Sequence, residues 1–116
     1  MKDSMNLQAL LAASAKKPSQ SKALFALLNL GILESLTNGL LSAADAVRLF
    51  FHAENCLFVR KKLRDKTADE IMSRGVQLPD LFAALPADDA QREFQHELAT
   101  IRSLCLKLLD KKSLVA

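Results

Sequence analysis

Hydrophobic and polar positions along the chain repeat mostly with the period of an α-helix, most clearly between Ser42 and Leu63. On a helix over these residues, two apolar stripes lie on opposite sides of a narrow polar strip made of Arg48, Asn55 and Lys62. The first stripe contains Ala46, Leu49, Phe50, Ala53, Cys56 and Leu57. The second contains Val47, Phe51 and Phe58. Because a helix that is apolar nearly all round is usually buried, we expect this helix to be central in a bundle or to form half of an interface.

A second helix is predicted just before this one, from about Ser21 to Thr37, with an apolar core face. The core face contains Leu24, Phe25, Leu28, Ile32 and Leu36. Asn38 and Gly39 end this helix, since either residue can adopt the left-handed conformation. Ser42 and Asp45 have the spacing of a capping box, which starts the next helix at once. The tight Gly39–Ser42 connection therefore predicts two antiparallel neighbouring helices.

The remaining segments also predict helices. Ser4 is a candidate cap for a short first helix, which ends at Lys16–Ser19. Thr67 and Glu70 have capping-box spacing for a short helix that Gly75 closes, and a shorter helix follows from Pro79 to Leu85. The last helix runs from Asp88 to about Lys111. Its apolar seam consists of Phe94, Leu98, Ile101, Cys105 and Leu108.

Composition agrees with a helical protein of one domain. The chain has 116 residues, of which only three are Gly and three are Pro, and no stretch alternates with the period of a strand. The prediction is an all-α, single-domain bundle of four to five helices. Residues 1–18 form a short helix or a partly flexible arm, and residues 19–116 form the bundle. No apolar run is long enough to cross a membrane, and we expect a cytoplasmic protein.

Gly31 lies inside the predicted 21–37 helix, at the edge of its core face. A glycine there costs about 1 kcal/mol of helix propensity, so some other property must favour it. One interpretation is that it lets a neighbouring backbone approach closely. The other is a kink, or a break into two shorter helices.

Positive charge is concentrated in one run near the end of the 42–63 helix. The run contains Arg60, Lys61, Lys62, Arg64 and Lys66, and it accounts for the whole formal net charge of +3. A small nucleic-acid-binding regulator would use such side chains to neutralise phosphates. Against this, the chain has no Trp or Tyr to stack on bases. Cations at a helix C-terminus also complement the helix dipole, which explains the run without any partner.

His52 and Cys56 are the candidate chemical pair, since they lie four residues apart and thus on one side of a helix. A zinc site needs three or four ligands, and Cys105 would have to come from the last helix. A catalytic pair would need a group to orient the imidazole. A metal- or thiol-dependent enzyme is therefore the third alternative. Two free, buried thiols are favoured over a disulfide between Cys56 and Cys105.

These patterns predict a non-enzymatic protein–protein interaction or regulatory module that needs no cofactor. We expect it to form a homodimer, or to hold a partner helix, through Val47, Phe51 and Phe58. A monomer rarely leaves a large contiguous apolar patch in water. The competing interpretation is that the N-terminal helix and the 67–85 connector cover these side chains within one chain.

Overall fold

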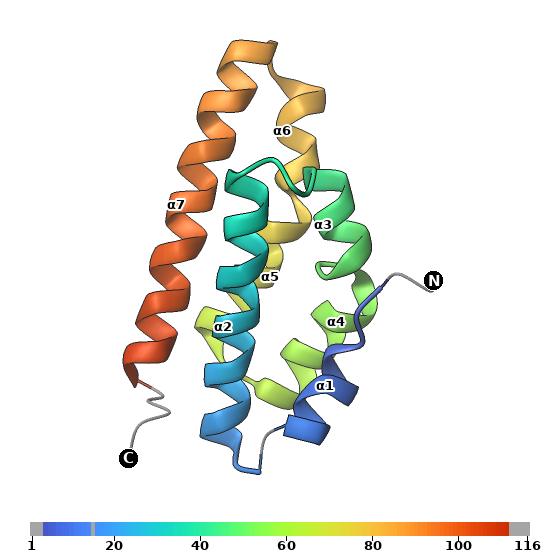
Figure 1. Ribbon diagram of the computed structural model, residues 1–116, viewed down its shortest axis with the longest axis vertical. Coiled ribbons are helices and arrows are strands. Elements are labelled where there is room, and N and C mark those ends of the chain that lie inside the picture. Colours follow the sequence, from blue (N-terminus) through green and yellow to red (C-terminus); the bar gives the residue numbers. More distant parts are fainter. Residues whose placement is uncertain (1–3, 15, 112–116) are drawn as a thin grey trace.

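The computed structural model describes residues 4–14 and 16–111, and within them every regular element is a helix. The elements in chain order are α1 (Leu7–Ser14), α2 (Pro18–Thr37), α3 (Ala43–Leu49), α4 (Ala53–Phe58), the π-helix η1 (Val59–Leu63), α5 (Lys66–Val76), α6 (Leu78–Ala84) and α7 (Ala87–Lys111). They form one compact bundle (Figure 1). The predicted all-α fold is confirmed.

The helix α2 is long and packs against much of the bundle on one side. It contacts α1, α3, α5, η1 and α7, and α7 runs antiparallel beside it (Figure 1). Its inner side chains are fully or almost fully buried: Ala23, Phe25, Ala26, Asn29, Ile32, Leu33 and Leu36. The prediction that residues 42–63 form one central helix is wrong, because the structure divides this segment into α3, α4 and η1.

The connection between α2 and α3 agrees with its predicted chemistry. Gly39 has a φ of 74°, in the left-handed region that glycine favours. The Ser42 hydroxyl oxygen accepts the Asp45 N–H at 3.0 Å, and the Asp45 carboxylate accepts the Ser42 N–H at 3.3 Å. This capping box begins α3, and the chain reverses direction between α2 and α3 (Figure 1).

The predicted 42–63 helix is broken in the middle. It ends as α3 at Leu49, restarts as α4 at Ala53 and finishes as the π-helix η1. At the break, the Phe51 N–H donates to the Ala46 carbonyl oxygen, five residues back. Neighbouring side chains on a continuous helix point about 100° apart. The break instead lets Phe50 and Phe51 both enter the core, with their rings edge to face at 5.3 Å.

Two of the predicted helix starts are shifted along the chain. α1 begins after Asn6, whose side-chain oxygen accepts the Ala9 N–H at 3.0 Å, so Ser4 does not cap it. α5 begins after Asp65, whose Oδ1 accepts the Thr67 and Ala68 N–H groups at 2.9 and 3.1 Å. Gly75 does not close α5 but lies inside it, buried. At the starts of α1 and α5, the side chains of Asn6 and Asp65 accept backbone N–H groups, which makes these residues the caps.

Candidate interaction surface

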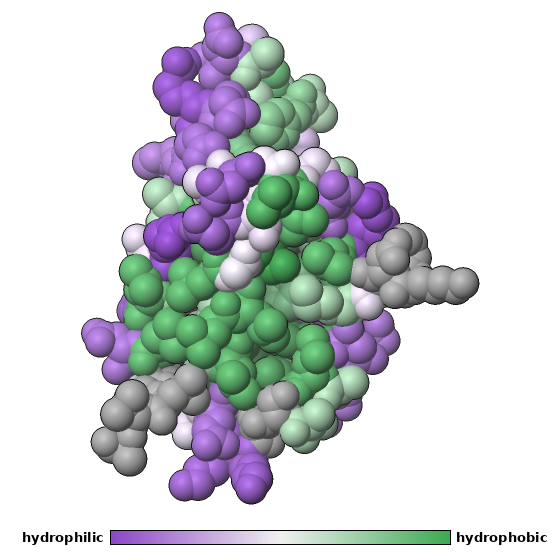
Figure 2. Space-filling view, in the orientation of Figure 1, coloured by the Kyte–Doolittle hydropathy of each residue, from purple (hydrophilic) through white to green (hydrophobic). Residues whose placement is uncertain are grey.

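An apolar groove runs along the outer face of α2, and we call it the α2 groove. It has a volume of about 580 Å³, and its apolar side chains come from α2, from the loop after it and from α3. They are Leu24, Leu27, Leu28, Leu40, Leu41 and Leu49, with Met5 and Ile32 also lining it. Figure 2 shows a broad hydrophobic area over this part of the molecule. Leu27 is 43% exposed and Leu40 is 78% exposed, so the groove is open to solvent.

Gly31 lies in the α2 groove beside Leu27 and Leu28. A Cβ added at Gly31 would have nothing within 4 Å, so within residues 4–14 and 16–111 no other element covers this part of the helix. The predicted kink is not observed, because α2 continues as an α-helix from Pro18 to Thr37. Of the residues that the structure describes, no Asp, Glu, Lys or Arg lines the groove. The result is an uncharged surface on which the α2 backbone can be approached closely.

The predicted interface residues do not form one exposed stripe. Phe51 is 0% exposed, so its assignment to an interface is wrong. Val47 and Phe58 are partly buried and pack against the core from two different elements, α3 and α4. The break at Phe50–His52 explains this result, because it turns Phe51 inward and separates the two halves of the predicted stripe.

His52 and Asn55 attach the N-terminal segment to the broken helix. The Asn55 amide is buried; its Nδ2 donates to the carbonyl oxygens of Met5 at 3.1 Å and Phe50 at 2.8 Å, and its Oδ1 accepts the Leu7 N–H at 3.0 Å. His52 caps α4 by accepting the Asn55 N–H on Nδ1, at 3.4 Å. Its Nε2 therefore carries the proton and donates to the Met5 carbonyl oxygen at 2.9 Å.

Asn55 was placed on a solvated polar strip by its sequence position, and its role was missed. One signal in the sequence could have indicated this role. Asn55 follows His52 by three residues, which is the spacing of a helix cap, and it lies between residues of the two apolar stripes. Both His52 ring nitrogens are used in this attachment. The pair His52 and Cys56 therefore has a structural explanation.

Neither cysteine is activated as a nucleophile. Both are free thiols, and burial raises the pKa of Cys56 above its usual value of 9.0. Burial raises the pKa of Cys105 further, to about 12. The thiolate is the reactive form, so both side chains stay protonated near neutral pH. Among the described residues, no group of three or more His, Cys, Asp or Glu side chains could hold a metal ion.

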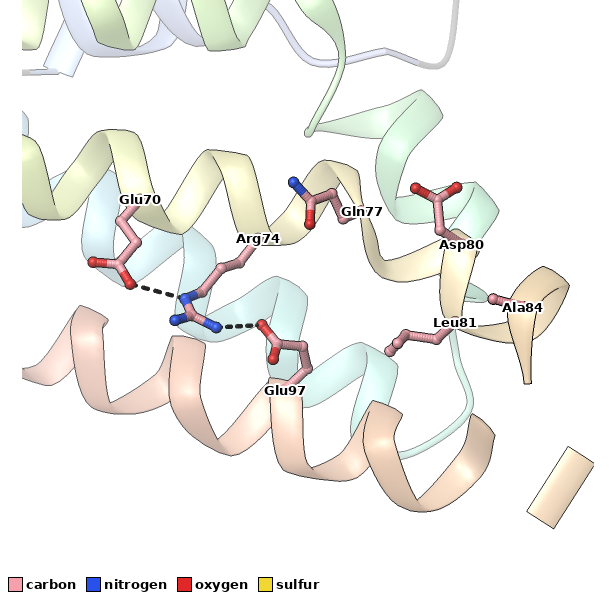
Figure 3. Close-up of a pocket in the computed structure, with 7 residues that line it drawn as sticks. All are labelled: Glu70, Arg74, Gln77, Asp80, Leu81, Ala84 and Glu97. Atoms are coloured by element: carbon pink, nitrogen blue, oxygen red, sulfur yellow. Dashed lines mark hydrogen bonds and ion pairs between the residues drawn. The ribbon is translucent and has the colours of Figure 1, made fainter. Parts of the chain in front are cut away.

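A polar pocket lies between α5, α6 and α7, and it was not predicted. Arg74 donates from Nε to Glu70 at 2.9 Å and from Nη1 to Glu97 at 2.8 Å, which links α5 to α7 (Figure 3). Hydrogen bonds to Glu97 and then Glu70 raise the pKa of Arg74. Gln77 and Asp80 line the same pocket (Figure 3). The Glu70–Arg74 spacing was readable from the sequence, but the contact with Glu97 depends on the fold.

The basic run lies at the end of the bundle where α2 begins (Figure 1). Arg60, Lys61 and Lys62 lie in η1. Arg64 follows η1 in the left-handed conformation, with a φ of 51°. Arg60 pairs with Asp69 at 3.5 Å, and Lys22 of α2 pairs with Asp65 of the run at 3.5 Å. Lys62 lines a small pocket together with Lys16, Lys17 and Lys22. The fold therefore adds three lysines that the run alone did not include.

Among the described helices, none is long and apolar enough to cross a membrane. Neither curated proteins nor solved structures gave a match to the chain. A family model described as a protein of unknown function (DUF3969) matches residues 16–115. The match spans α2 through α7 and leaves α1 outside it. The chain therefore belongs to the DUF3969 family.

Proposed function

We propose that this protein is a non-enzymatic interaction module that self-associates through the α2 groove. The observation that carries the proposal is Gly31, a glycine on the outer face of α2 that no described residue covers, beside the exposed Leu27. Apolar surface that one chain leaves in water is stabilised when a partner covers it. The proposed interface replaces the one predicted from Val47, Phe51 and Phe58.

A second copy of the chain is the partner that this surface favours. A twofold dimer needs one patch that is complementary to itself, and an uncharged groove meets this condition because no like charges face each other across the axis. A small residue on a helix lets the backbone of another helix come close. Two copies of α2 can therefore cross at Gly31, with Leu27 and Leu28 of each chain packing against the other.

The other groups argue against a catalytic role. The two thiols have raised pKa values, and His52 uses both ring nitrogens to hold Met5 and Asn55. Arg74 is held by two carboxylates of the chain itself. An enzyme would need an activated group aimed into a pocket. These side chains instead have structural roles.

The test is the molar mass in solution, measured by light scattering for the natural chain and for Gly31→Glu. Because nothing lies within 4 Å of a Cβ at Gly31, the glutamate fits the monomer, but it would place a charge in the proposed interface. Ala99→Glu on the exposed side of α7 adds the same charge elsewhere and is the matched control. Concentration should be measured by refractive index, because the chain has no Trp or Tyr.

We expect the natural chain and Ala99→Glu to be dimers and Gly31→Glu to be a monomer with unchanged helicity. A natural chain that is monomeric at concentrations near 100 µM, set as an order-of-magnitude limit, would overturn self-association. A dimer that Gly31→Glu leaves intact would show that the contact lies on another face.

A further inference from the structure

Positively charged side chains from two distant parts of the sequence meet at one end of the bundle. The first group, at the start of α2, is Lys16, Lys17 and Lys22, and the second is the run Arg60, Lys61, Lys62, Arg64 and Lys66. The Lys22–Asp65 ion pair and a pocket of about 260 Å³ that both groups line bring them together. This basic end holds half of the 16 Lys and Arg residues of the chain.

Most of these cations are not neutralised within the chain. Lys22 pairs with Asp65 and Arg60 pairs with Asp69. The other six are exposed and have no carboxylate partner among residues 4–14 and 16–111. Gathering like charges costs electrostatic free energy, which a polyanion would recover. The opposite end of the bundle, at α6 and the start of α7, is acidic instead, with Asp80, Asp88, Asp89 and Glu93.

We propose that the basic end binds the phosphodiester backbone of nucleic acid, without reading its sequence. Lysine and arginine side chains neutralise phosphates, whereas sequence readout requires contacts to base edges. The chain has no Trp or Tyr on which bases could stack. The pocket that both groups line has room for one phosphate group, and the side chains of Lys16, Lys17 and Lys62 beside it are exposed.

The shape of this surface favours nucleic acid over an anionic lipid surface. A protein that binds a membrane interface inserts apolar side chains beside its cations. Here the apolar members of the pocket are packed inward, since Leu63 is 7% exposed and Phe58 packs against the core. The exposed apolar area over α2 lies next to the basic end (Figure 2), so binding to anionic vesicles is the competing outcome that the test must separate.

The test is binding of the full chain to a fluorescently labelled duplex of about 20 base pairs, followed by anisotropy, with a second duplex of scrambled sequence. The observed binding constant falls with salt by a logarithmic slope of about −0.9 per phosphate neutralised. Six cations predict a slope near −5 and a loss of about 1,000-fold between roughly 50 and 200 mM salt. Both duplexes should bind equally.

Two variants of equal charge change distinguish the basic end from net charge alone. Lys62→Glu lies in the lysine pocket and should weaken binding about tenfold or more, with a shallower salt slope. Arg92→Glu, at the acidic end, should change binding less than about twofold. Both side chains are exposed, so circular dichroism should show intact helices.

No binding at about 50 mM salt, or equal losses for both variants, would overturn the proposal. Binding to vesicles containing anionic lipid without binding to either duplex would also overturn it. Repeating the assay with the Gly31→Glu variant separates this proposal from self-association. The basic end should bind the duplex in that variant as well.

Discussion

The ring of Phe51 packs directly on the Cα of Gly75, so closely that α5 has no room for a side chain there. A Cβ built at Gly75 would lie 2.4 Å from two of the ring carbons. Phe51 is fully buried at the break between α3 and α4, and Gly75 is buried inside α5. This contact explains why a glycine is needed in the last turn of α5.

Gly75→Ala should destabilise the fold, because the added methyl group must displace Phe51 or the α5 backbone. Overpacking of this kind costs about 1–3 kcal/mol. Gly31→Ala is the matched control: its Cβ meets nothing, so it should stabilise the monomer by about 0.5–1 kcal/mol through helix propensity. Urea unfolding of both variants measures the difference. A stabilising Gly75→Ala would mean that Phe51 can move without cost.

Asn55→Ala should release the N-terminal segment. The substitution removes the amide that donates to Met5 and Phe50 and accepts from Leu7, and it leaves buried backbone groups unpaired. We expect a loss of about 2–4 kcal/mol in the free energy of unfolding. Hydrogen exchange followed by mass spectrometry should show faster exchange in α1. Glu54→Ala, at the exposed neighbouring position, should have little effect, and equal exchange in both variants would contradict this role.

Asn29→Ala should leave the fold as stable as before, or stabilise it by up to about 1 kcal/mol. Asn29 is 0% exposed in α2, and its Oδ1 has no partner among the described residues. Removing the side chain removes the cost of burying that oxygen, which offsets the lost packing. Leu33→Ala, equally buried in the same helix, should cost about 2–5 kcal/mol. Asn29 Nδ2 donates to the Phe25 carbonyl oxygen at 3.0 Å. Thermal unfolding compares the two variants, and similar losses would show that Oδ1 is paired as well.

The alkaline stability of the fold should depend on Cys105. Its thiol ionises near 9.0 when the chain is unfolded, but burial raises the pKa to about 12 in the fold. The stability is therefore fully present below 9.0 and is lost as the pH rises toward 12. The loss should approach about 1.4 kcal/mol per pH unit.

Cys105→Ala provides the comparison, since all other titratable groups are the same in both proteins. The variant should show a flatter fall in the free energy of unfolding above pH 9.0. At pH 8, alkylation should modify Cys56 before Cys105, because Cys56 is only partly buried. An alkaline profile that the substitution leaves unchanged would contradict the raised pKa.

Local chemistry made part of this structure predictable. Ser42 and Asp45 form the expected capping box because its hydrogen bonds lie within four residues, and Gly39 has the expected positive φ. The break at Phe50 was not predictable from local signals, because no Gly or Pro marks it. It is stabilised by the Met5 carbonyl, 47 residues from His52, and by the space that Gly75 leaves for Phe51.

The candidate surfaces show the same division. The basic run was visible in the sequence, but Lys16, Lys17 and Lys22 join it only because α2 begins beside η1. Gly31 was expected to let a neighbouring backbone approach closely, but nothing described lies within 4 Å of a Cβ there. Periodicity also placed the surplus apolar surface on the 42–63 segment instead of on α2. In the structure the 42–63 segment is divided into α3, α4 and η1, Phe51 is buried there, and the outer face of α2 is open to solvent.

The attachment of α1 has a consequence for variation within the family. The family match begins at residue 16, yet the Asn55 amide inside it is completed by Met5 and Leu7, which lie before it. The N-terminal helix and the amide at position 55 should therefore occur together within the family. Relatives with an N-terminal helix should carry an amide at the position of Asn55. Relatives without that helix should carry an apolar side chain there, because a buried amide without hydrogen-bond partners destabilises the fold.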